Sequence, residues 1–284
     1  MKSVNFQKYQ GIGNDFILID AITNPHSLDL NKFTIDKVTS LCHRNYGIGS
    51  DGIILVLPSK ILDFSIKILN SDGSEAEMCG NGIRCVIKFI LDNDIVSKKD
   101  KYLVETKAGK IEASVEENFL IKVNMGTPVI SPKEIPVSLP LDKNGIASGE
   151  ININDIRLKV FSIGMGNPHA VIYVNSLETV KLKEWGELIE NYNYFPLKTN
   201  VHFVHIHNRN QLNVLVWERG CGPTLACGTG ACACLAISSL LDRSDNRANV
   251  NLPGGTLEIY WPNSEGNIFM TGEAQYVFSG RFLV

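Results

Sequence analysis

Residues 78–85 read MCGNGIRC, and residues 226–233 read ACGTGACA. In each stretch a cysteine stands before a Gly-x-Gly turn, and the turn opens a run with the apolar spacing of a helix. The two cysteines, Cys79 and Cys227, are 148 positions apart (227 − 79), about half of the 284-residue chain. A motif that recurs at half the chain length predicts two similar domains.

A second pair of motifs supports the repeat. Residues 11–16 read GIGNDF and residues 164–169 read GMGNPH, which places Asn14 and Asn167 153 positions apart (167 − 14). The alternative is a chance match between glycine-rich turns. Two motif pairs in the same order, at nearly equal offsets, argue against chance and favour two similar halves.

The boundary between the halves is expected in residues 125–139, MGTPVISPKEIPVSL, which contain three prolines and no sustained periodicity. We therefore expect a first domain at residues 1–126 and a second at residues 127–270. The closing residues, GEAQYVFSGRFLV, read as a strand without a partner in the second half. We expect residues 271–284 to return and complete the first domain.

Short apolar runs between Gly, Pro and polar residues predict strands. The clearest are Ile53–Leu57, Ile111–Val115, Leu120–Val123, Ala170–Val174, His202–Ile206 and Leu212–Val216. Helical periodicity is found in fewer places: Ile35–His43, Asn81–Asn93, Leu182–Tyr192 and Gly230–Leu241. The sequence thus predicts an α+β protein that is rich in strands.

Composition narrows the class of protein. With 44% hydrophobic and 20% charged residues the chain can bury a sizeable core, and a net charge of −3 gives no basic surface for nucleic acid or an anionic membrane. No apolar run approaches the length of a membrane span, and the first residues lack the features of a signal peptide. Seven cysteines, an odd number, do not fit a disulfide framework. We expect a cytoplasmic protein with a small-molecule partner.

The two cysteine turns predict thiols at helix N-termini. Backbone N–H groups and the positive end of the helix dipole gather there, so a carboxylate can be held and a thiol pKa is expected to fall below its free value. Four glycines let the backbone approach a ligand closely: Gly80, Gly82, Gly228 and Gly230.

The pairing of Cys79 with Cys227 predicts a reaction. Inverting a stereocentre without a cofactor requires a base on one face of the α-carbon and an acid on the other, and two opposed thiols provide both. A lone cysteine is more often a small buried apolar residue. That reading applies to the other five: Cys42, Cys85, Cys221, Cys232 and Cys234.

At the level of whole motifs, the chain resembles the diaminopimelate epimerase family nearly end to end. The matching blocks are GIGNDF, RNYGIGSDG, NSDGSEAEMCGNGIRC, GNPH, TNV, ERGCGPTLACGTGACA, PGG and GEAQYVFSG. The resemblance implies two pseudo-symmetric domains, each a β-barrel-like sheet around a central helix. It also implies interconversion of LL- and meso-diaminopimelate in lysine and cell-wall precursor biosynthesis, a homodimer, and neither pyridoxal phosphate nor a metal.

The resemblance also assigns residues. The catalytic ones are Cys79, Cys227, Glu218 and His169, with the last two assisting the thiols. The substrate-binding ones are Asn14, Asn70, Gly80, Asn81, Asn167, Asn200, Glu218, Arg219, Gly228 and Thr229. Their chemistry suits an amino acid with two zwitterionic ends, because Arg219 can fork onto a carboxylate and Glu218 can accept from an ammonium.

Three residues depart from the common pattern of the family. Gly52 stands where some members carry a glutamine that contacts the distal end of the substrate. Cys221 and Pro223 replace a small residue and a glutamate, so the GCGPT turn is expected to differ.

The alternative functions are those of other enzymes with the same fold, of a metal or redox protein, and of a non-catalytic binding module. Proline or hydroxyproline racemases share paired thiols but bind one carboxylate, and phenazine-type isomerases lack the cysteine pair. A metal or redox protein using Cys227, Cys232 and Cys234 has the wrong spacing. A non-catalytic binding module would not need both thiols.

Overall fold

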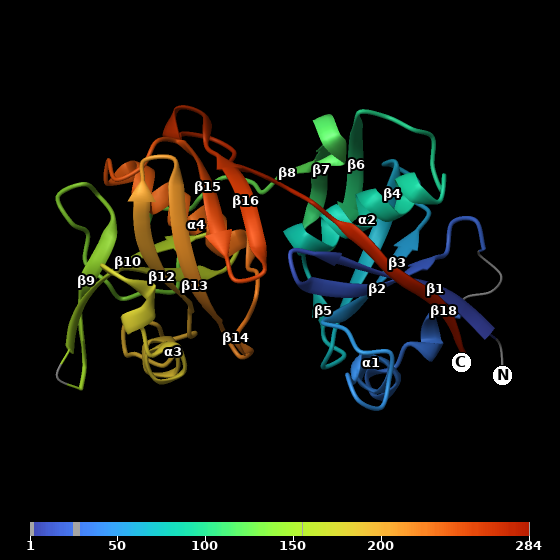
Figure 1. Cartoon of the computed structure of the whole chain (residues 1–284), viewed down its shortest axis with the longest axis horizontal. Helices are drawn as coiled ribbons and strands as arrows, with labels where there is room; N and C mark the ends of the chain where they lie inside the picture. Colours follow the sequence, from blue (N-terminus) through green and yellow to red (C-terminus); the bar gives the residue numbers. More distant parts are fainter. Residues whose placement is uncertain (1–2, 25–28, 155, 284) are drawn as a thin grey trace. The chain divides into compact units, whose positions relative to one another are not determined.

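The structure is a computed structural model that describes residues 3–24, 29–154 and 156–283. The chain divides into two compact units: Met1–Val123 with Gly272–Val284, and Asn124–Thr271 (Figure 1). Both units are mostly strand, with two α-helices in the described residues of each. The predicted α+β class of two domains is confirmed, and each unit is described separately below.

The first unit begins with a hairpin and ends with the last strand of the chain. Its strands are β1 (Ser3–Gly11), β2 (Asn14–Asp20), β3 (Gly52–Leu57), β4 (Phe64–Asn70), β5 (Glu75–Ala76), β6 (Lys101–Thr106), β7 (Gly109–Val115), β8 (Ile121–Asn124) and β18 (Gln275–Leu283). Its helices are α1 (Ile35–Cys42), α2 (Gly80–Asp92), and the 3-10 turns η1 (Leu30–Lys32) and η2 (Glu117–Phe119).

The second unit has the same kinds of element in nearly the same order. Its strands are β9 (Ala147–Ile153), β10 (Ile156–Gly164), β11 (Pro168–Tyr173), β12 (Asn200–Asn208), β13 (Gln211–Glu218), β14 (Gly222–Pro223), β15 (Arg247–Leu252), β16 (Gly255–Tyr260) and β17 (Phe269–Gly272). Its helices are α3 (Leu182–Glu190), α4 (Gly228–Leu240), and the 3-10 turns η3 (Leu177–Thr179) and η4 (Pro262–Ser264).

The strand pairings of the two units are equivalent. In the first, β18, β1 and β2 pair antiparallel, β2–β3 is parallel, β3–β4 antiparallel, β4–β6 parallel, and β6–β7–β8 antiparallel. In the second, the series β9, β10, β11, β12, β13, β15, β16, β17 repeats every one of those directions. The chain's last strand, β18, therefore occupies the position that β9 occupies at the start of the second series.

Each unit has one central helix that contacts most strands of its series and one further α-helix that contacts fewer of them. The central helix α4 contacts β10, β11, β12, β13, β15 and β16, and α2 contacts β1, β2, β3, β7 and β18. Helix α4 is buried over nearly its whole length, and small residues such as Ala231 and Ala233 let the surrounding strands approach it. The outer helices complete separate cores: Val38 and Leu41 in α1, and Trp185 and Ile189 in α3.

Gly82 and Gly230 are the third residues of α2 and α4, and replacing each by alanine should affect stability differently. A Cβ on Gly230 would lie 2.2 Å from Cε1 of the buried His202 ring, whereas a Cβ on Gly82 would meet the flexible end of Ile54, its Cδ1, at 2.9 Å. Overpacking costs about 1–3 kcal/mol, while alanine gains roughly 0.5–1 kcal/mol over glycine in a helix. We expect Gly230→Ala to lower the free energy of unfolding by about 2 kcal/mol, and Gly82→Ala to change it by less than about 1 kcal/mol. Urea unfolding curves measure both values. Equal losses would contradict this packing difference.

Candidate active site

The two motif cysteines occupy equivalent positions, each as the N-cap of a central helix. The Cys79 Sγ accepts the backbone N–H of Gly82 at 3.4 Å, and the Cys227 Sγ accepts that of Gly230 at 3.3 Å. Both residues have extended backbone, as an N-cap requires. The prediction that both thiols lie at helix N-termini is confirmed.

In the first unit, two motif asparagines lie beside Cys79. The Cys79 thiol is 3.8 Å from Oδ1 of Asn14, the first residue of β2, and Nδ2 of Asn81 donates to the same oxygen at 3.2 Å. These three residues come from the GIGNDF and MCGNGIRC motifs, so the structure joins both motifs in one polar cluster.

Charged neighbours fix how these two amides point. Nδ2 of Asn14 donates to the Asp51 carboxylate at 2.7 Å, and Oδ1 of Asn81 accepts from Arg84 at 2.9 Å. A carboxylate can only accept and a guanidinium can only donate, so neither amide can be reversed without an unfavourable contact. The oxygen of Asn14 therefore faces the Cys79 thiol.

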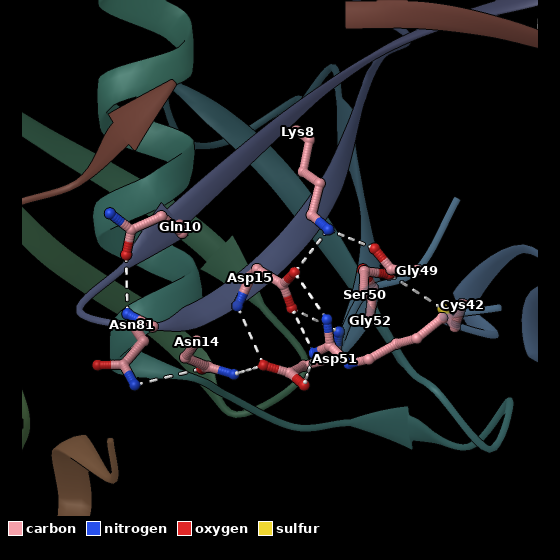
Figure 2. Close-up of polar contacts among 12 residues, drawn as sticks. Lys8, Gln10, Asn14, Asp15, Cys42, Gly49, Ser50, Asp51, Gly52 and Asn81 are labelled. Carbon is pink, nitrogen blue, oxygen red and sulfur yellow. Dashed lines mark hydrogen bonds and ion pairs between the residues drawn. The ribbon is translucent and has the colours of Figure 1, made fainter. Parts of the chain in front are cut away.

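Asp51 belongs to an ion-pair cluster beneath this site (Figure 2). Arg44 bridges Asp51 and Asp15 at 2.8 and 2.9 Å, and Lys8 binds Asp15 at 2.6 Å. Burial alone would raise the pKa of Asp15, but hydrogen bonds from Arg44 and Lys8 outweigh it and hold that pKa below its usual range. Sequence reasoning missed this cluster, although the charges at both ends of RNYGIGSDG were a signal.

The remaining candidates of the first unit lie at the edges of this cluster. Asn70 ends β4 and is exposed, and its side chain donates to Ser74 at 2.9 Å rather than joining the amides beside Cys79. Gly52 lies opposite Asn70 in the β3–β4 pair, and a Cβ on it would lie 2.5 Å from the Leu69 carbonyl oxygen. Only glycine fits there in this chain. Gly80 opens α2 and is buried.

In the second unit, the polar groups beside Cys227 are a hydroxyl and a carboxylate. Its Sγ is 3.5 Å from the Thr229 hydroxyl, and the carboxylate of Glu218, at the end of β13, accepts from Thr224 at 2.5 Å. Burial and the negative charge of Glu218 raise the pKa of Cys227 well above its usual value. The expectation of a lowered pKa is wrong for this thiol, because burial outweighs the helix N-terminus. Gly228 is the first residue of α4.

Asn200 and Arg219 are joined through the backbone. The buried Asn200 side chain donates to the Pro168 carbonyl at 3.0 Å and accepts the Arg219 N–H at 3.0 Å. The Arg219 guanidinium is exposed and donates to the Leu197 carbonyl at 3.1 Å. The side chain of Asn200 thus holds the turn from which Arg219 projects.

His169 is fully buried and uses both ring nitrogens. Its Nε2 lies 2.7 Å from Oδ1 of Asn167, and its Nδ1 lies 2.8 Å from Nε2 of His202, which the sequence did not single out. Burial, followed by His202 and Arg219, holds the pKa of His169 well below its usual value, and burial lowers the pKa of His202 to about 3. Both rings are neutral near pH 7.

Two further observations concern the described residues as a whole. Their cysteines are not joined in disulfides, and the same residues include no group of three or more His, Cys, Asp or Glu that could hold a metal ion. No described helix has the length and apolar character needed to cross a membrane.

The buried histidines predict an acid-sensitive fold. In the unfolded chain each would gain a proton below about pH 6.5, while in the folded chain each stays neutral, so stability should fall as the pH drops below that value. The loss is at most roughly 1.4 kcal/mol per pH unit and per histidine. Urea midpoints at about pH 7 and pH 5 measure it. We expect His202→Gln to remove about half of this pH dependence and the exposed His207→Met to leave it intact; an unchanged slope in His202→Gln would contradict the assignment.

The chain is similar to known proteins in sequence and in fold. The family model described as "Diaminopimelate epimerase" matches residues 6–131 and 161–277. The diaminopimelate epimerase of Prochlorococcus marinus (strain NATL1A) is 52% identical over 278 residues, 98% of each chain. That of Carboxydothermus hydrogenoformans is 43% identical over 281 residues, 99% of this chain and 100% of the relative.

Solved structures share the fold at low sequence identity. A PhzF-family phenazine biosynthesis protein from Bacillus anthracis has a TM-score of 0.73 at 18% identity over the whole of both chains. A hydroxyproline epimerase from Agrobacterium vitis has a TM-score of 0.70 at 14% identity, over 99% of this chain and 92% of its own. These likenesses concern the fold alone, whereas the family model and the close relatives span nearly the full length. The chain belongs to the diaminopimelate epimerase family.

Proposed function

We propose that this protein interconverts LL- and meso-diaminopimelate without a cofactor, with Cys79 and Cys227 as the acid–base pair. The observation that carries the proposal is the equivalence of the two thiols: each caps the central helix of one of two units with the same strand series. The relatives named diaminopimelate epimerase support the substrate.

The protonation of Cys227 supports a distinct role for it in one direction of the reaction. Cys227 has a raised pKa and is a thiol at rest, so it delivers a proton to the α-carbon. Cys79 removes the α-proton in that direction, and the Gly82 N–H and the α2 N-terminus would stabilise the negative charge that its sulfur carries as a base. In the opposite direction the roles exchange, and the carboxylate of Glu218 favours the return of a proton to Cys227.

The substrate's charged groups have matching partners. Backbone N–H groups at Gly80, Asn81, Gly228 and Thr229 suit the carboxylate of the reacting end. The exposed Arg219 guanidinium donates one bond to the Leu197 carbonyl, which leaves further N–H groups for a carboxylate of the distal end. Amide groups complete recognition of ammonium and carboxylate at Asn14, Asn70 and Asn167. Asn200 acts through the turn that carries Arg219. Nε2 of His169 lies 2.7 Å from Oδ1 of Asn167 and helps to hold this amide in place.

Replacing either thiol by a hydroxyl tests the pair. We expect Cys79→Ser and Cys227→Ser to fold normally but to lose about three or more orders of magnitude in epimerisation, because serine is too weak a base near neutral pH. Turnover of LL-diaminopimelate, followed by chiral chromatography, measures this. The exposed Cys221→Ser is the control and should keep parental activity. Near-parental turnover by either active-site variant contradicts the two-thiol mechanism.

We also propose that the protein is a cytoplasmic homodimer that pairs through β18. The cysteines of the described residues are not joined in disulfides, which suits a reducing compartment. Strand β18 begins the strand series of the first unit, where β1 is its partner. Its side chains Tyr276, Val277 and Phe278 are 49%, 48% and 39% exposed, a run of apolar groups that an edge strand seldom leaves to water. A second copy of this chain is the partner with a matching surface.

A charge on this strand should separate the dimer. We expect Val277→Lys to weaken association by about thirtyfold or more, because it would bury an unpaired charge, as measured by sedimentation velocity over a dilution series. Ile61→Lys, at an apolar residue that is 76% exposed on a loop, is the control and should leave association unchanged. A monomeric parent protein, or an unaffected Val277→Lys dimer, contradicts the proposed interface.

A further inference from the structure

His202 is a buried ionisable side chain to which the proposed mechanism gives no role. It lies on β12, and its ring packs on the first turn of α4, where a Cβ on Gly230 would lie 2.2 Å from its Cε1. Its ring also lies beside that of His169, with centroids 5.0 Å apart. The Gly230 N–H on that turn donates to Cys227, so His202 supports the cysteine turn of this unit.

The hydrogen bonds of the two neutral rings decide where the protons are. Nδ1 of His202 is buried and has no hydrogen-bond partner among the described residues. A proton there would be a buried N–H without an acceptor, which costs more than an unused lone pair. The proton of His202 is therefore on Nε2, where it donates to Nδ1 of His169 at 2.8 Å.

The tautomer of His202 in turn fixes the tautomer of His169 and the orientation of the Asn167 amide. Because Nδ1 of His169 accepts, its own proton is on Nε2, which donates to Oδ1 of Asn167 at 2.7 Å. Oδ1 of Asn167 thus already accepts a hydrogen bond from His169, and the NH₂ group of Asn167 is the part of the amide that can donate to a ligand.

We propose that His202 is a positioning residue, which fixes the tautomer of His169 and so makes Asn167 a hydrogen-bond donor that reads a carboxylate of the substrate. The proposal rests on the proposed function, since it assumes that Asn167 contacts an amino-acid substrate. In this proposal, His202 and His169 decide that the Asn167 amide faces the ligand with its NH₂ group, which the GMGNPH motif alone does not determine.

The equivalent asparagine of the first unit has the opposite polarity. Asn14 uses its NH₂ group on Asp51 and turns its oxygen toward Cys79, where it can accept from an N–H or S–H donor. The repeated Gly-Asn turns therefore present an acceptor in one unit and a donor in the other. Such a difference suits an amino-acid substrate, whose ammonium and carboxylate need opposite partners.

The unmodified protein gives the first test. In protein labelled with ¹⁵N-histidine, the ring-nitrogen shifts distinguish protonated from bare nitrogens, and single substitutions assign the six histidines. We expect His169 and His202 to be neutral near pH 7 with the proton on Nε2 in both. A proton on Nδ1 of His169 overturns the proposal, whether or not the protein acts on diaminopimelate.

A matched pair of variants gives the second test. His202→Gln keeps an N–H donor at about the position of Nε2, whereas His202→Met has similar reach and no donor. We expect the glutamine variant to keep the His169 tautomer, and the methionine variant to show both tautomers. For the methionine variant, KM for diaminopimelate should rise about tenfold with kcat changed less than about threefold, because a ground-state contact is lost. The glutamine variant should stay within about threefold of the parent in both constants.

The control is His207→Met, an exposed histidine on the same strand, which should change neither the His169 shifts nor the kinetics. Equal KM values for the methionine and glutamine variants, both folded, overturn the proposal. A parent protein that does not turn over diaminopimelate contradicts the proposed function instead, and the ¹⁵N spectrum still decides the tautomer.

Discussion

A cysteine that caps a helix is the constraint on which both units depend. The thiol accepts the N–H of the third helical residue, which leaves the remaining N–H groups of the first turn directed at the space beside the sulfur. Glycine is required at that third residue in the second unit, where the ring of His202 fills the space of a side chain. Several strands contact each helix, so the reactive group is held by a helix most of whose residues are buried.

The two thiols are equivalent in backbone but not in surroundings. Near Cys79 the polar groups are amides whose orientation is set by charges, Asp51 on one side and Arg84 on the other. Near Cys227 they are a hydroxyl and the carboxylate of Glu218, and burial keeps the thiol protonated. A duplicated scaffold thus carries two different electrostatic environments, as a reaction with one acid and one base requires.

Local patterns in the sequence predicted the repeat, the four helices and the helix-capping cysteines, because these depend on residues within a few positions of one another. The predicted helix at Leu182–Tyr192, for example, is α3 at Leu182–Glu190. The ion pairs of Asp15 with Arg44, and the contact of His169 with His202, join residues 29 and 33 positions apart and depend on strand pairing. The raised pKa of Cys227 could not be predicted either, since burial is a property of the folded unit.

The central claim is that two different groups exchange protons with the α-carbon, and solvent deuterium tests it most directly. The unmodified protein is incubated with LL-diaminopimelate in deuterated water without added cofactor, and product and remaining substrate are analysed early in the reaction. A two-base mechanism predicts α-deuterium in the meso product and almost none in recovered LL substrate, because the acid that delivers the proton is not the base that removed one. Deuterium entering the recovered substrate as fast as product forms, or product that retains the original proton, would show a single base and contradict the paired thiols.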